Sequence, residues 1–389
     1  MFRRITSASG VLLFAGFAIL LCWAAQAWII GIGRDRDQFE PVVRASKRVV
    51  PATQRCSACH AGVHQNMATS PHRRTLNEGA DPEIRSRFAG RSFQHTLGGP
   101  TVSFEERDQQ LWMKSDAYPD AIRVDWMFGS GQHAMTPVSL LVNTAGATEL
   151  IEGSVSWFPP GVLGATPGAN LSGTPGISSL GSPQDHPTTL ECFGCHVTQL
   201  PVQNGRILTD EMFRGVTCER CHFGGEQHAR AMELGSSYSW QKWSDLTPLE
   251  SVNRCGECHR RADQLTPDEL LPERTVLVRF ASVGLAMSRC FLDQDTVHDP
   301  ANKTRLDCLT CHDPHRPAER SSASYVQKCL QCHGLEASQA RECTSSQTAS
   351  NCLSCHMPSV SVADNLVLTD HWIRVRKDSD PPVAVSEDQ

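Results

Sequence analysis

Seven copies of one short pattern recur along the chain: two cysteines separated by two residues, with a histidine directly after the second cysteine. Such cysteine pairs form disulfides, bind zinc or attach a c-type haem. In a c-type haem the two sulfurs form thioethers with the porphyrin, and the histidine gives the iron one axial nitrogen. Neither a disulfide nor a zinc cluster explains why a histidine follows every pair. The pattern therefore predicts seven covalently attached haem c groups.

These copies use 14 of the 17 cysteines and 7 of the 16 histidines. On a helical turn, positions i, i+3 and i+4 share one face, so both sulfurs and the imidazole of one copy can meet the same macrocycle. Three copies fall within residues 308–356, which predicts a stack of haems there. The predicted haem-binding residues are Cys56, Cys59 and His60; Cys192, Cys195 and His196; Cys218, Cys221 and His222; Cys255, Cys258 and His259; Cys308, Cys311 and His312; Cys329, Cys332 and His333; and Cys352, Cys355 and His356.

Nine histidines lie outside these copies. An iron with imidazole on both faces is coordinatively saturated and suited to moving one electron, whereas an iron with a free face can bind and convert a small molecule. Because nine exceeds seven, the sequence allows every iron a second histidine without requiring it.

The segment 215–228, which contains Cys218-Glu-Arg-Cys221-His222 and His228, resembles the Cys-Glu-x-Cys-His-Gly-Pro-Gly-x-x-His element of the cytochrome c-552/4 type domain. That domain belongs to the superfamily of the nitrifier tetrahaem cytochrome, hydroxylamine oxidoreductase and pentahaem nitrite reductase. Together with the further matches, the resemblance covers most of residues 56–373. These further matches are Ser70-Pro71-His72, Phe128 to His133, Cys311 to His315, Cys355 to Pro358 and Thr369 to His371.

In proteins of this superfamily, the histidine outside the haem motif commonly binds a haem attached elsewhere in the chain. The resemblance therefore implies five second axial ligands, namely His72, His133, His228, His315 and His371. His298, ten residues before Cys308, is predicted as a sixth. For His64, His95 and His186, iron ligation and an ordinary surface or hydrogen-bonded role both stay open.

The sequence departs from the enzymes of that superfamily. The Cys-x-x-Cys-Lys motif of the pentahaem nitrite reductase is absent from it. Hydroxylamine oxidoreductase links a tyrosine to its catalytic haem, but Tyr325, four residues before Cys329, is explained by helix packing, and the other tyrosines are Tyr118 and Tyr238. No catalytic residue is therefore predicted. An electron carrier is favoured over a catalyst, and an enzyme of this kind would be a multihaem oxidoreductase.

The low aromatic content predicts that side chains alone form only a thin hydrophobic core. Only 6% of the 389 residues are aromatic, so porphyrins are expected to supply the main apolar filling and to couple folding to cofactor attachment. The formal net charge is −6, and no basic run suggests nucleic acid. We therefore predict a mainly α fold with little regular structure, a haem-packed core, a small β-rich insert and an N-terminal transmembrane helix.

The spacing of the motifs suggests divisions of the chain. No motif lies between the first, which ends at His60, and Cys192, and alternating apolar residues at 138–142 and 150–157 predict strands there. Residues 247–250, Thr-Pro-Leu-Glu, predict a capped helix that runs into the fourth motif. The predicted divisions are an anchor at 1–33, a tether at 34–55, the first haem with the β-rich insert and a Gly/Pro loop at 56–191, a six-haem domain at 192–373 and a disordered tail at 374–389.

The N-terminus predicts membrane attachment. Residues 11–32 are uncharged, and these 22 residues span about 33 Å as a helix, enough for a hydrocarbon core of about 30 Å. An uncleaved anchor is favoured over a signal peptide that ends at Ala25-Gln26-Ala27. The basic residues after the segment oppose the positive-inside rule, although long translocated domains largely override it. Because c-type haem is attached outside the bacterial cytoplasmic membrane, we expect a single-pass protein with its body in the periplasm.

Three cysteines lie outside the motifs. Cys22 falls in the apolar segment, where packing explains it. Cys290 and Cys343 either pair as a disulfide in an oxidising compartment or stay as buried thiols.

These observations favour a membrane-anchored heptahaem cytochrome that passes electrons between a membrane donor, such as a quinol-linked protein, and a redox partner. One alternative is a multihaem oxidoreductase that acts on a small nitrogen or sulfur compound at an open haem. Another is a docking subunit of a larger respiratory complex. The spare histidines favour the relay over the enzyme.

Overall fold

The computed structural model describes residues 53–95, 99–169, 175–239, 241–294, 305–333 and 352–383. The predicted membrane segment, the tether up to residue 52, His298 and Cys343 lie outside these ranges. Within the described ranges, no helix is both long enough and apolar enough to span a membrane.

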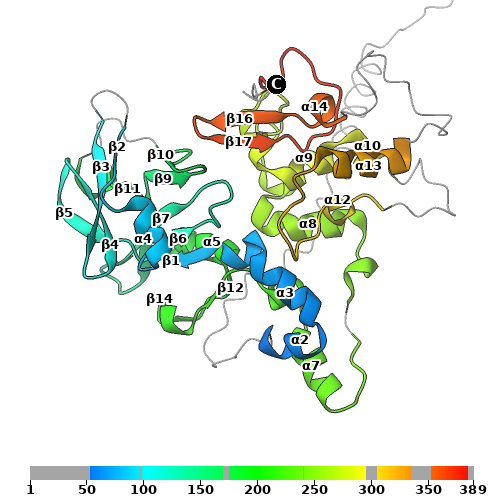
Figure 1. The fold of residues 1–389 in the computed structure, drawn as a ribbon, viewed down its shortest axis with the longest axis horizontal. Coiled ribbons are helices and arrows are strands. Elements are labelled where there is room, and N and C mark those ends of the chain that lie inside the picture. Colours follow the sequence, from blue (N-terminus) through cyan, green and yellow to red (C-terminus); the bar gives the residue numbers. More distant parts are fainter. Residues whose placement is uncertain are drawn as a thin grey trace, which may run out of the picture.

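Strands dominate residues 76–184, the part of the molecule on the left of Figure 1. One antiparallel sheet has five strands in the order β1-β6-β7-β8-β11, and a second has four in the order β2-β3-β4-β5. A two-stranded ribbon of β9 and β10 adjoins them. The bounds are β1 Leu76–Glu78, β2 Ser92–Gln94, β3 Thr101–Arg107, β4 Gln110–Ser115, β5 Tyr118–Arg123, β6 Trp126–Phe128, β7 Thr136–Val142, β8 Thr148–Gly153, β9 Val155–Phe158, β10 Val162–Ala165 and β11 Gly181–Gln184.

The prediction of a mainly α fold with little regular structure is wrong. Strands β10 and β11 fall inside residues 159–187, whose Gly, Pro, Ser and Thr content predicts a loop. The strands bury alternate residues, as when β3 buries Val102 and Phe104 and β4 buries Leu111 and Met113. Mostly aliphatic and methionine side chains fill this core, together with a few aromatic ones such as Phe88, so a low aromatic content of the whole chain does not prevent one.

A helix ties the first motif after the sheets to this β-rich part. Helix α5 (His186–His196) begins at Asp185, whose carboxylate accepts a hydrogen bond from the Thr188 backbone N–H at 2.9 Å. Phe193 on α5 is buried against Phe128 of β6, with ring centroids 5.2 Å apart. This packing fixes the position of α5, which carries Cys192, because moving the helix away from the five-stranded sheet would expose Phe193 and Phe128.

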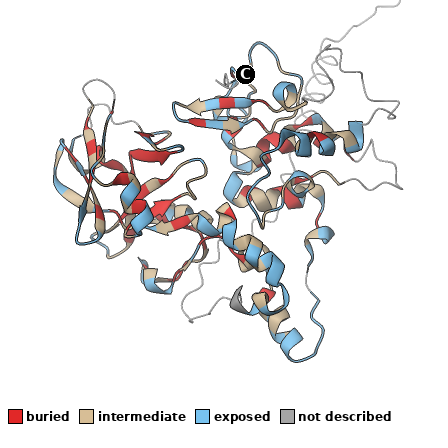
Figure 2. Cartoon of the chain, viewed as in Figure 1, coloured by how far each residue is buried: buried red, intermediate tan, exposed pale blue. Residues whose placement is uncertain are grey.

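The other motifs also lie on short helices. Four of these, α8, α12, α13 and α14, are on the right of Figure 1 below and beside the hairpin of β16 and β17, and α2 is at the bottom next to α7. Figure 2 shows far less burial on these helices than on the sheets, and α6, α12 and α14 bury none of their residues. Side chains alone therefore do not pack this region. Besides α5, the α-helices of the described residues, with and without motifs, are α2 Thr53–Cys59, α3 Ala61–Thr69, α4 Pro82–Phe88 beside the sheets, α6 Cys218–Cys221, α7 Gly225–Glu233, α8 Pro248–His259, α9 Ala281–Met287, α10 Arg289–Leu292, α12 Cys308–Cys311, α13 Ser322–His333 and α14 Cys352–His356.

Short 3₁₀ turns and strands of two to five residues make up the remaining regular structure of the described residues. The turn η2 carries His72, and η7 lies beside the β16 and β17 hairpin. The bounds are η2 Pro71–Arg74, η3 Gly176–Ser179, η4 Thr209–Glu211, η5 Trp243–Asp245, η6 Ala262–Gln264, η7 Thr275–Arg279, β12 Val197–Gln199, β13 Val202–Gln203, β14 Arg206–Ile207, β15 Phe213–Arg214, β16 Ser359–Ala363 and β17 Leu366–Thr369.

The predicted cap of α8 is confirmed. Thr247 Oγ1 accepts a hydrogen bond from the Glu250 backbone N–H at 3.2 Å, and the Glu250 carboxylate accepts one from the Thr247 backbone N–H at 2.6 Å. Pro248 takes the first helical position, where its missing N–H costs nothing. The helix then runs to His259 and presents the fourth motif.

Candidate haem-binding cavity

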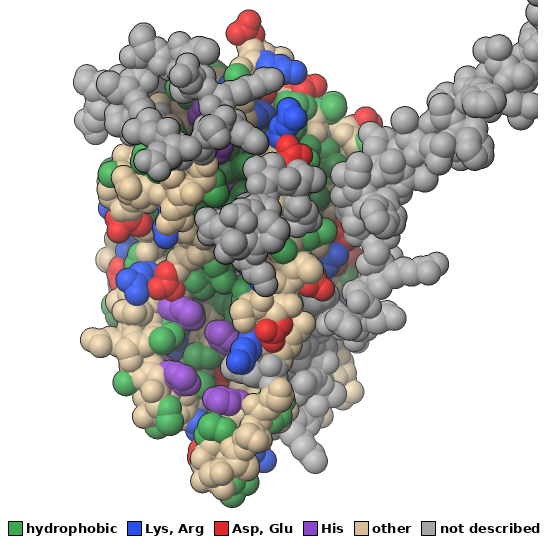
Figure 3. All heavy atoms as spheres, turned by 90° about the vertical axis from the view of Figure 1, so that its right-hand side faces the viewer, with side chains coloured by type: hydrophobic (Ala, Val, Ile, Leu, Met, Phe, Trp, Pro, Cys, Tyr) green, Lys and Arg blue, Asp and Glu red, His purple; other side chains and the backbone are tan. Residues whose placement is uncertain are grey.

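One large cavity of about 4590 Å³ is lined by residues from all seven motifs. Every predicted attachment residue except Cys192 contributes to its wall. Figure 3, which faces the right-hand side of Figure 1, shows several histidine side chains gathered among apolar ones on that surface. A cavity of this size and lining is the space that flat apolar cofactors would occupy.

Four pairs of histidines face each other across this cavity. In each pair one ring belongs to a motif and the other comes from elsewhere in the chain. The pairs and their distances between ring centroids are His60 with His228 at 6.5 Å, His72 with His259 at 6.2 Å, His222 with His315 at 6.1 Å, and His312 with His371 at 6.2 Å.

These distances fit a metal ion between two imidazoles. A bond of about 2.0 Å joins an imidazole nitrogen to a transition metal, so two rings bound to opposite sides of one ion have centroids about 6 Å apart. Directly stacked or edge-to-face aromatic pairs cover a broad range of 4.5–7 Å, so four pairs within a few tenths of an ångström are not explained by ring packing alone. The residues present therefore fit an iron between each pair.

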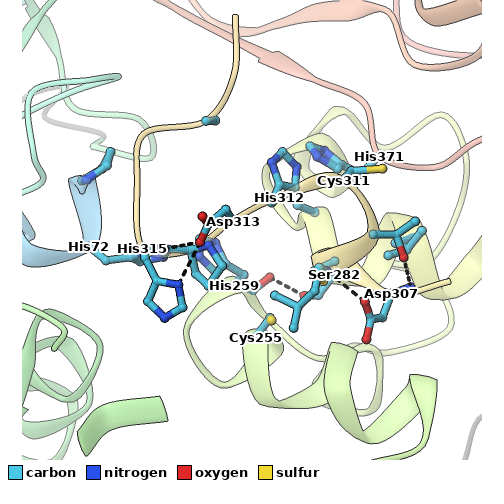
Figure 4. Close-up of a pocket in the computed structure, with 18 of the residues that line it drawn as sticks. His72, Cys255, His259, Ser282, Asp307, Cys311, His312, Asp313, His315 and His371 are labelled. Atoms are coloured by element: carbon cyan, nitrogen blue, oxygen red, sulfur yellow. Dashed lines mark hydrogen bonds and ion pairs between the residues drawn. The ribbon is translucent and has the colours of Figure 1, made fainter. Parts of the chain in front are cut away.

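The Nδ1 atoms of several of these rings have fixed partners. A partner on Nδ1 leaves Nε2 to face a metal and sets the orientation of the ring. The Nδ1–H groups of four histidines donate to backbone carbonyls, in the bonds His72 to Pro314 (3.2 Å), His196 to Thr75 (2.8 Å), His356 to Arg374 (3.1 Å) and His371 to Thr369 (2.9 Å). The ring of His315 differs, because its Nδ1–H donates to the Asp313 carboxylate at 2.8 Å (Figure 4).

The electrostatics of the cavity favour neutral imidazoles. Burial lowers the pKa of His196, His312 and His371, and it lowers the pKa of His259 to about 4, with His72 as the next cause. A neutral imidazole is the form that binds a metal.

Thiols from different motifs lie near one another. Burial, followed by the Cys218 thiol, raises the pKa of Cys56 to about 11. Burial, followed by the Cys352 thiol, raises the pKa of Cys329 to about 11. The Cys195 Sγ lies 3.9 Å from the backbone oxygen of Glu257, next to the fourth motif. The attachment points of separate motifs are therefore neighbours.

His196 of the second motif has a different environment from the paired histidines. Its ring stacks on Phe128 with centroids 4.2 Å apart and planes 15° apart. Within the described ranges, no histidine ring faces it in the way seen in the four pairs. The cavity wall in this region includes Glu152, whose carboxyl pKa is raised by burial, and Arg279, whose charge acts in the opposite direction.

The structure places some, but not all, of the candidate second ligands opposite a motif histidine. Of the six candidates, the structure places His72, His228, His315 and His371 in pairs. His133 lies in the connection between β6 and β7 and lines the cavity, but no described histidine ring pairs with it. The sixth candidate, His298, lies outside the described residues.

The histidines left open by the sequence have other surroundings. His95 is buried and hydrogen-bonded to Ser154 at 3.1 Å, and His186 donates from Nδ1 to the Thr148 carbonyl at 2.8 Å. His64 lines the cavity. Asp313, which the sequence did not single out, lies two residues before a predicted ligand in an Asp-Pro-His segment, and this short spacing is the signal that would have found it.

A comparison with protein families gives one match. The family described as cytochrome c554 and c-prime matches residues 176–224, which contain α5 and α6 and therefore the second and third motifs. The findings support a multihaem c-type cytochrome. The match also supports covalently attached haem c as the cofactor, for which the cysteines of the motifs are the predicted attachment residues.

Structural and sequence comparisons add little to this. The crystal structure of the outer cell wall cytochrome OcwA matches with a TM-score of 0.46 and 14% sequence identity, over 82% of this chain and 78% of that chain. At this level of similarity we infer nothing about function from it. A comparison with curated proteins gave no match.

Proposed function

We propose that this cytochrome is a heptahaem electron relay. The observation that carries the proposal is the set of four histidine pairs with ring centroids 6.1–6.5 Å apart. When bound, each haem supplies an iron that gains and loses one electron. Rings held on both sides of an iron leave no face for substrate, so these four sites are built to transfer electrons.

The pairs define the proposed axial ligands of four irons. The motif histidines His60, His222, His259 and His312 would each bind the iron of the haem attached to their own motif. Their partners come from other segments, so each haem links two parts of the chain and stabilises their contact. The partners, in the same order, are His228, His315, His72 and His371.

Contacts between the motif helices support an order in which electrons pass from haem to haem. The first motif, on α2, is linked to α6 through α7, because α7 carries His228, the partner of His60, and contacts α6. Helix α6 is linked to α8 by an ion pair at 3.4 Å between Arg220 and Glu257. Helix α8 also contacts α5 and α12, α12 contacts α13, and α13 contacts α14. The relay therefore runs through the haems on α2, α6, α8, α12, α13 and α14, and the haem on α5 forms a branch at α8.

We further propose a single-pass anchor at residues 1–33, with the body in the bacterial periplasm and a quinol-linked or other membrane donor. The uncharged segment 11–32 supports the anchor, and covalent haem attachment supports the location. The resemblance to the cytochrome c-552/4 domain supports a place in the superfamily that includes hydroxylamine oxidoreductase. Soluble or membrane-bound oxidoreductases are the proposed acceptors.

A second function is favoured by the surroundings of His196. The haem on α5 is at the end of the proposed branch, and no described histidine ring pairs with His196. Glu152 and His133 line the cavity and are groups that can hold or move a proton. This arrangement suits reduction or oxidation of a small nitrogen or sulfur compound at that iron.

The experiment that tests the relay is low-temperature electron paramagnetic resonance of the oxidised protein, together with optical spectra with and without cyanide. Haem content per chain is measured in parallel and is expected to be seven. Only low-spin signals, unchanged by cyanide, would support a pure relay. A high-spin component that cyanide removes would reject the pure relay and favour the second function.

A further inference from the structure

Among the histidine rings whose Nδ1 partner is defined in the cavity, His315 is the one bound to a carboxylate. Its Nδ1–H donates to Asp313 Oδ1 at 2.8 Å, and its backbone N–H donates to the same oxygen at 3.0 Å. Figure 4 shows Asp313 directed at this ring, close to His72 and His259. The other defined partners are neutral backbone carbonyls.

A carboxylate partner changes what an imidazole gives to a metal. An aspartate with an ordinary pKa near 3.9 is ionised at neutral pH. The negative charge draws the Nδ1 proton and makes Nε2 a more basic ligand than a ring bound to a carbonyl. A more basic axial ligand stabilises the ferric state over the ferrous state, which lowers the reduction potential.

The geometry of the pair places His315 where it would bind a single iron, the one that it shares with His222. Its ring faces His222 with centroids 6.1 Å apart and planes only 4° apart. Arg316 moderates the carboxylate, since its Nε lies 2.7 Å from Asp313 Oδ2, but its side chain is 59% exposed and solvent weakens its effect.

We propose that Asp313 lowers the reduction potential of the haem between His222 and His315, so that this iron is the last of the four histidine-paired irons to be reduced. Asp313 then acts on the iron through the charge that His315 transmits, and it sets one step in the energy profile of the relay. The proposal rests on the ligand assignments of the proposed function. In the proposed order this haem lies between those on α2 and α8, so the step falls inside the relay and not at its end.

The test is a spectroelectrochemical titration of the full chain with all haems attached, in the wild type and in Asp313→Asn. Asparagine keeps the shape and the acceptor oxygen but removes the charge. One haem is expected to become easier to reduce, with its ferrous-to-ferric ratio at a fixed potential rising about tenfold, which is about 59 mV for one electron. Arg316→Gln removes the moderating cation and is expected to shift the same haem in the opposite direction.

Asp293→Asn is the matched control. Asp293 also lines the cavity and makes a surface ion pair, with Arg289 at 3.0 Å, so this change alters net charge equally. It is expected to leave the lowest-potential haem nearly unchanged. Equal shifts in Asp313→Asn and Asp293→Asn would show a general charge effect and overturn the proposal.

Paramagnetic resonance separates the two levels of inference. Wild-type spectra without bis-imidazole low-spin signals would overturn the ligand assignments. Intact low-spin signals in Asp313→Asn with unshifted potentials would overturn the role of Asp313 alone. A lost low-spin signal in Asp313→Asn would show that the carboxylate only holds the ring in place, which also rejects tuning by charge.

Discussion

His72 and His259 face each other with ring centroids 6.2 Å apart and planes 81° apart, although one lies in η2 near the start of the described chain and the other ends α8. The pair brings the segment after the first motif against the fourth. His72 is held by a hydrogen bond of 3.2 Å to the carbonyl of Pro314, which follows the fifth motif. Three motifs are therefore joined at this point.

Replacing His72 with alanine should open one face of the iron bound by His259. We expect one low-spin signal to be replaced by a high-spin signal that cyanide removes. His186→Ala is the control, because His186 bonds to the Thr148 carbonyl and does not belong to a pair. Unchanged low-spin signals in His72→Ala would contradict the assignment of this pair.

A buried polar network joins α8 to α12. The Asp307 carboxylate accepts hydrogen bonds of 2.7 Å from Ser251 and Arg305, and Ser251 accepts one of 2.7 Å from Trp243. Asp307→Ala would leave the buried Ser251 hydroxyl without its acceptor and would remove the carboxylate acceptor of Arg305, which keeps only backbone carbonyls, so we expect a loss of about 2 kcal/mol in unfolding free energy.

Denaturant unfolding of the holoprotein measures this loss. The control Asp293→Ala removes an ion pair in which Arg289 is 92% exposed, and it should cost less than about 1 kcal/mol. Equal losses in the two variants would show that the network between α8 and α12 contributes no more than a surface pair.

The sequence indicated a multihaem c-type cytochrome, whereas its prediction of a mainly α fold was wrong. Attachment residues can be proposed from sequence because thioether formation and iron ligation require fixed residue types at fixed spacing, as in Cys218 to His222, and they stay a prediction. The assignment of partners cannot be proposed in this way, because the ring that faces His60 is set by how α7 packs against the rest of the chain. His133 resembles the family motif as closely as His72 does, yet no described ring pairs with it.

The number and extent of the β-strands were not predictable for a different reason. Short strands such as β1 and β6 give only three residues of alternation each, which is too little to distinguish from a loop. They become strands because neighbours in the five-stranded sheet supply their hydrogen bonds. The role of Asp313 is not predictable from sequence, because an aspartate near a proline is common at turns.

The capping box of α8 predicts a loss of stability in acid. Hydrogen bonds from the Thr247 backbone, and then from its hydroxyl, lower the pKa of Glu250 from its ordinary value of 4.5. Because the pKa is lower in the folded state, the carboxylate stabilises the protein above pH 4.5, and this stabilisation is lost as the pH falls through the folded pKa. Glu250→Gln should therefore show a smaller decrease in melting temperature than the wild type when the pH falls from 6 to about 3. Equal decreases would contradict this role.

The segment that carries His371 passes very close to α9 at Gly284. A Cβ at this position would lie 2.7 Å from the Trp372 backbone nitrogen and 2.9 Å from the His371 carbonyl carbon, so the backbone would have to move. Gly284→Ala should displace His371 from His312 and convert one low-spin signal to high spin, measured by paramagnetic resonance. The control is Gly62→Ala in α3, where nothing lies within 4 Å of the added methyl group and alanine favours the helix by about 1 kcal/mol. Retention of every low-spin signal in Gly284→Ala would show that this close approach does not position the ligand.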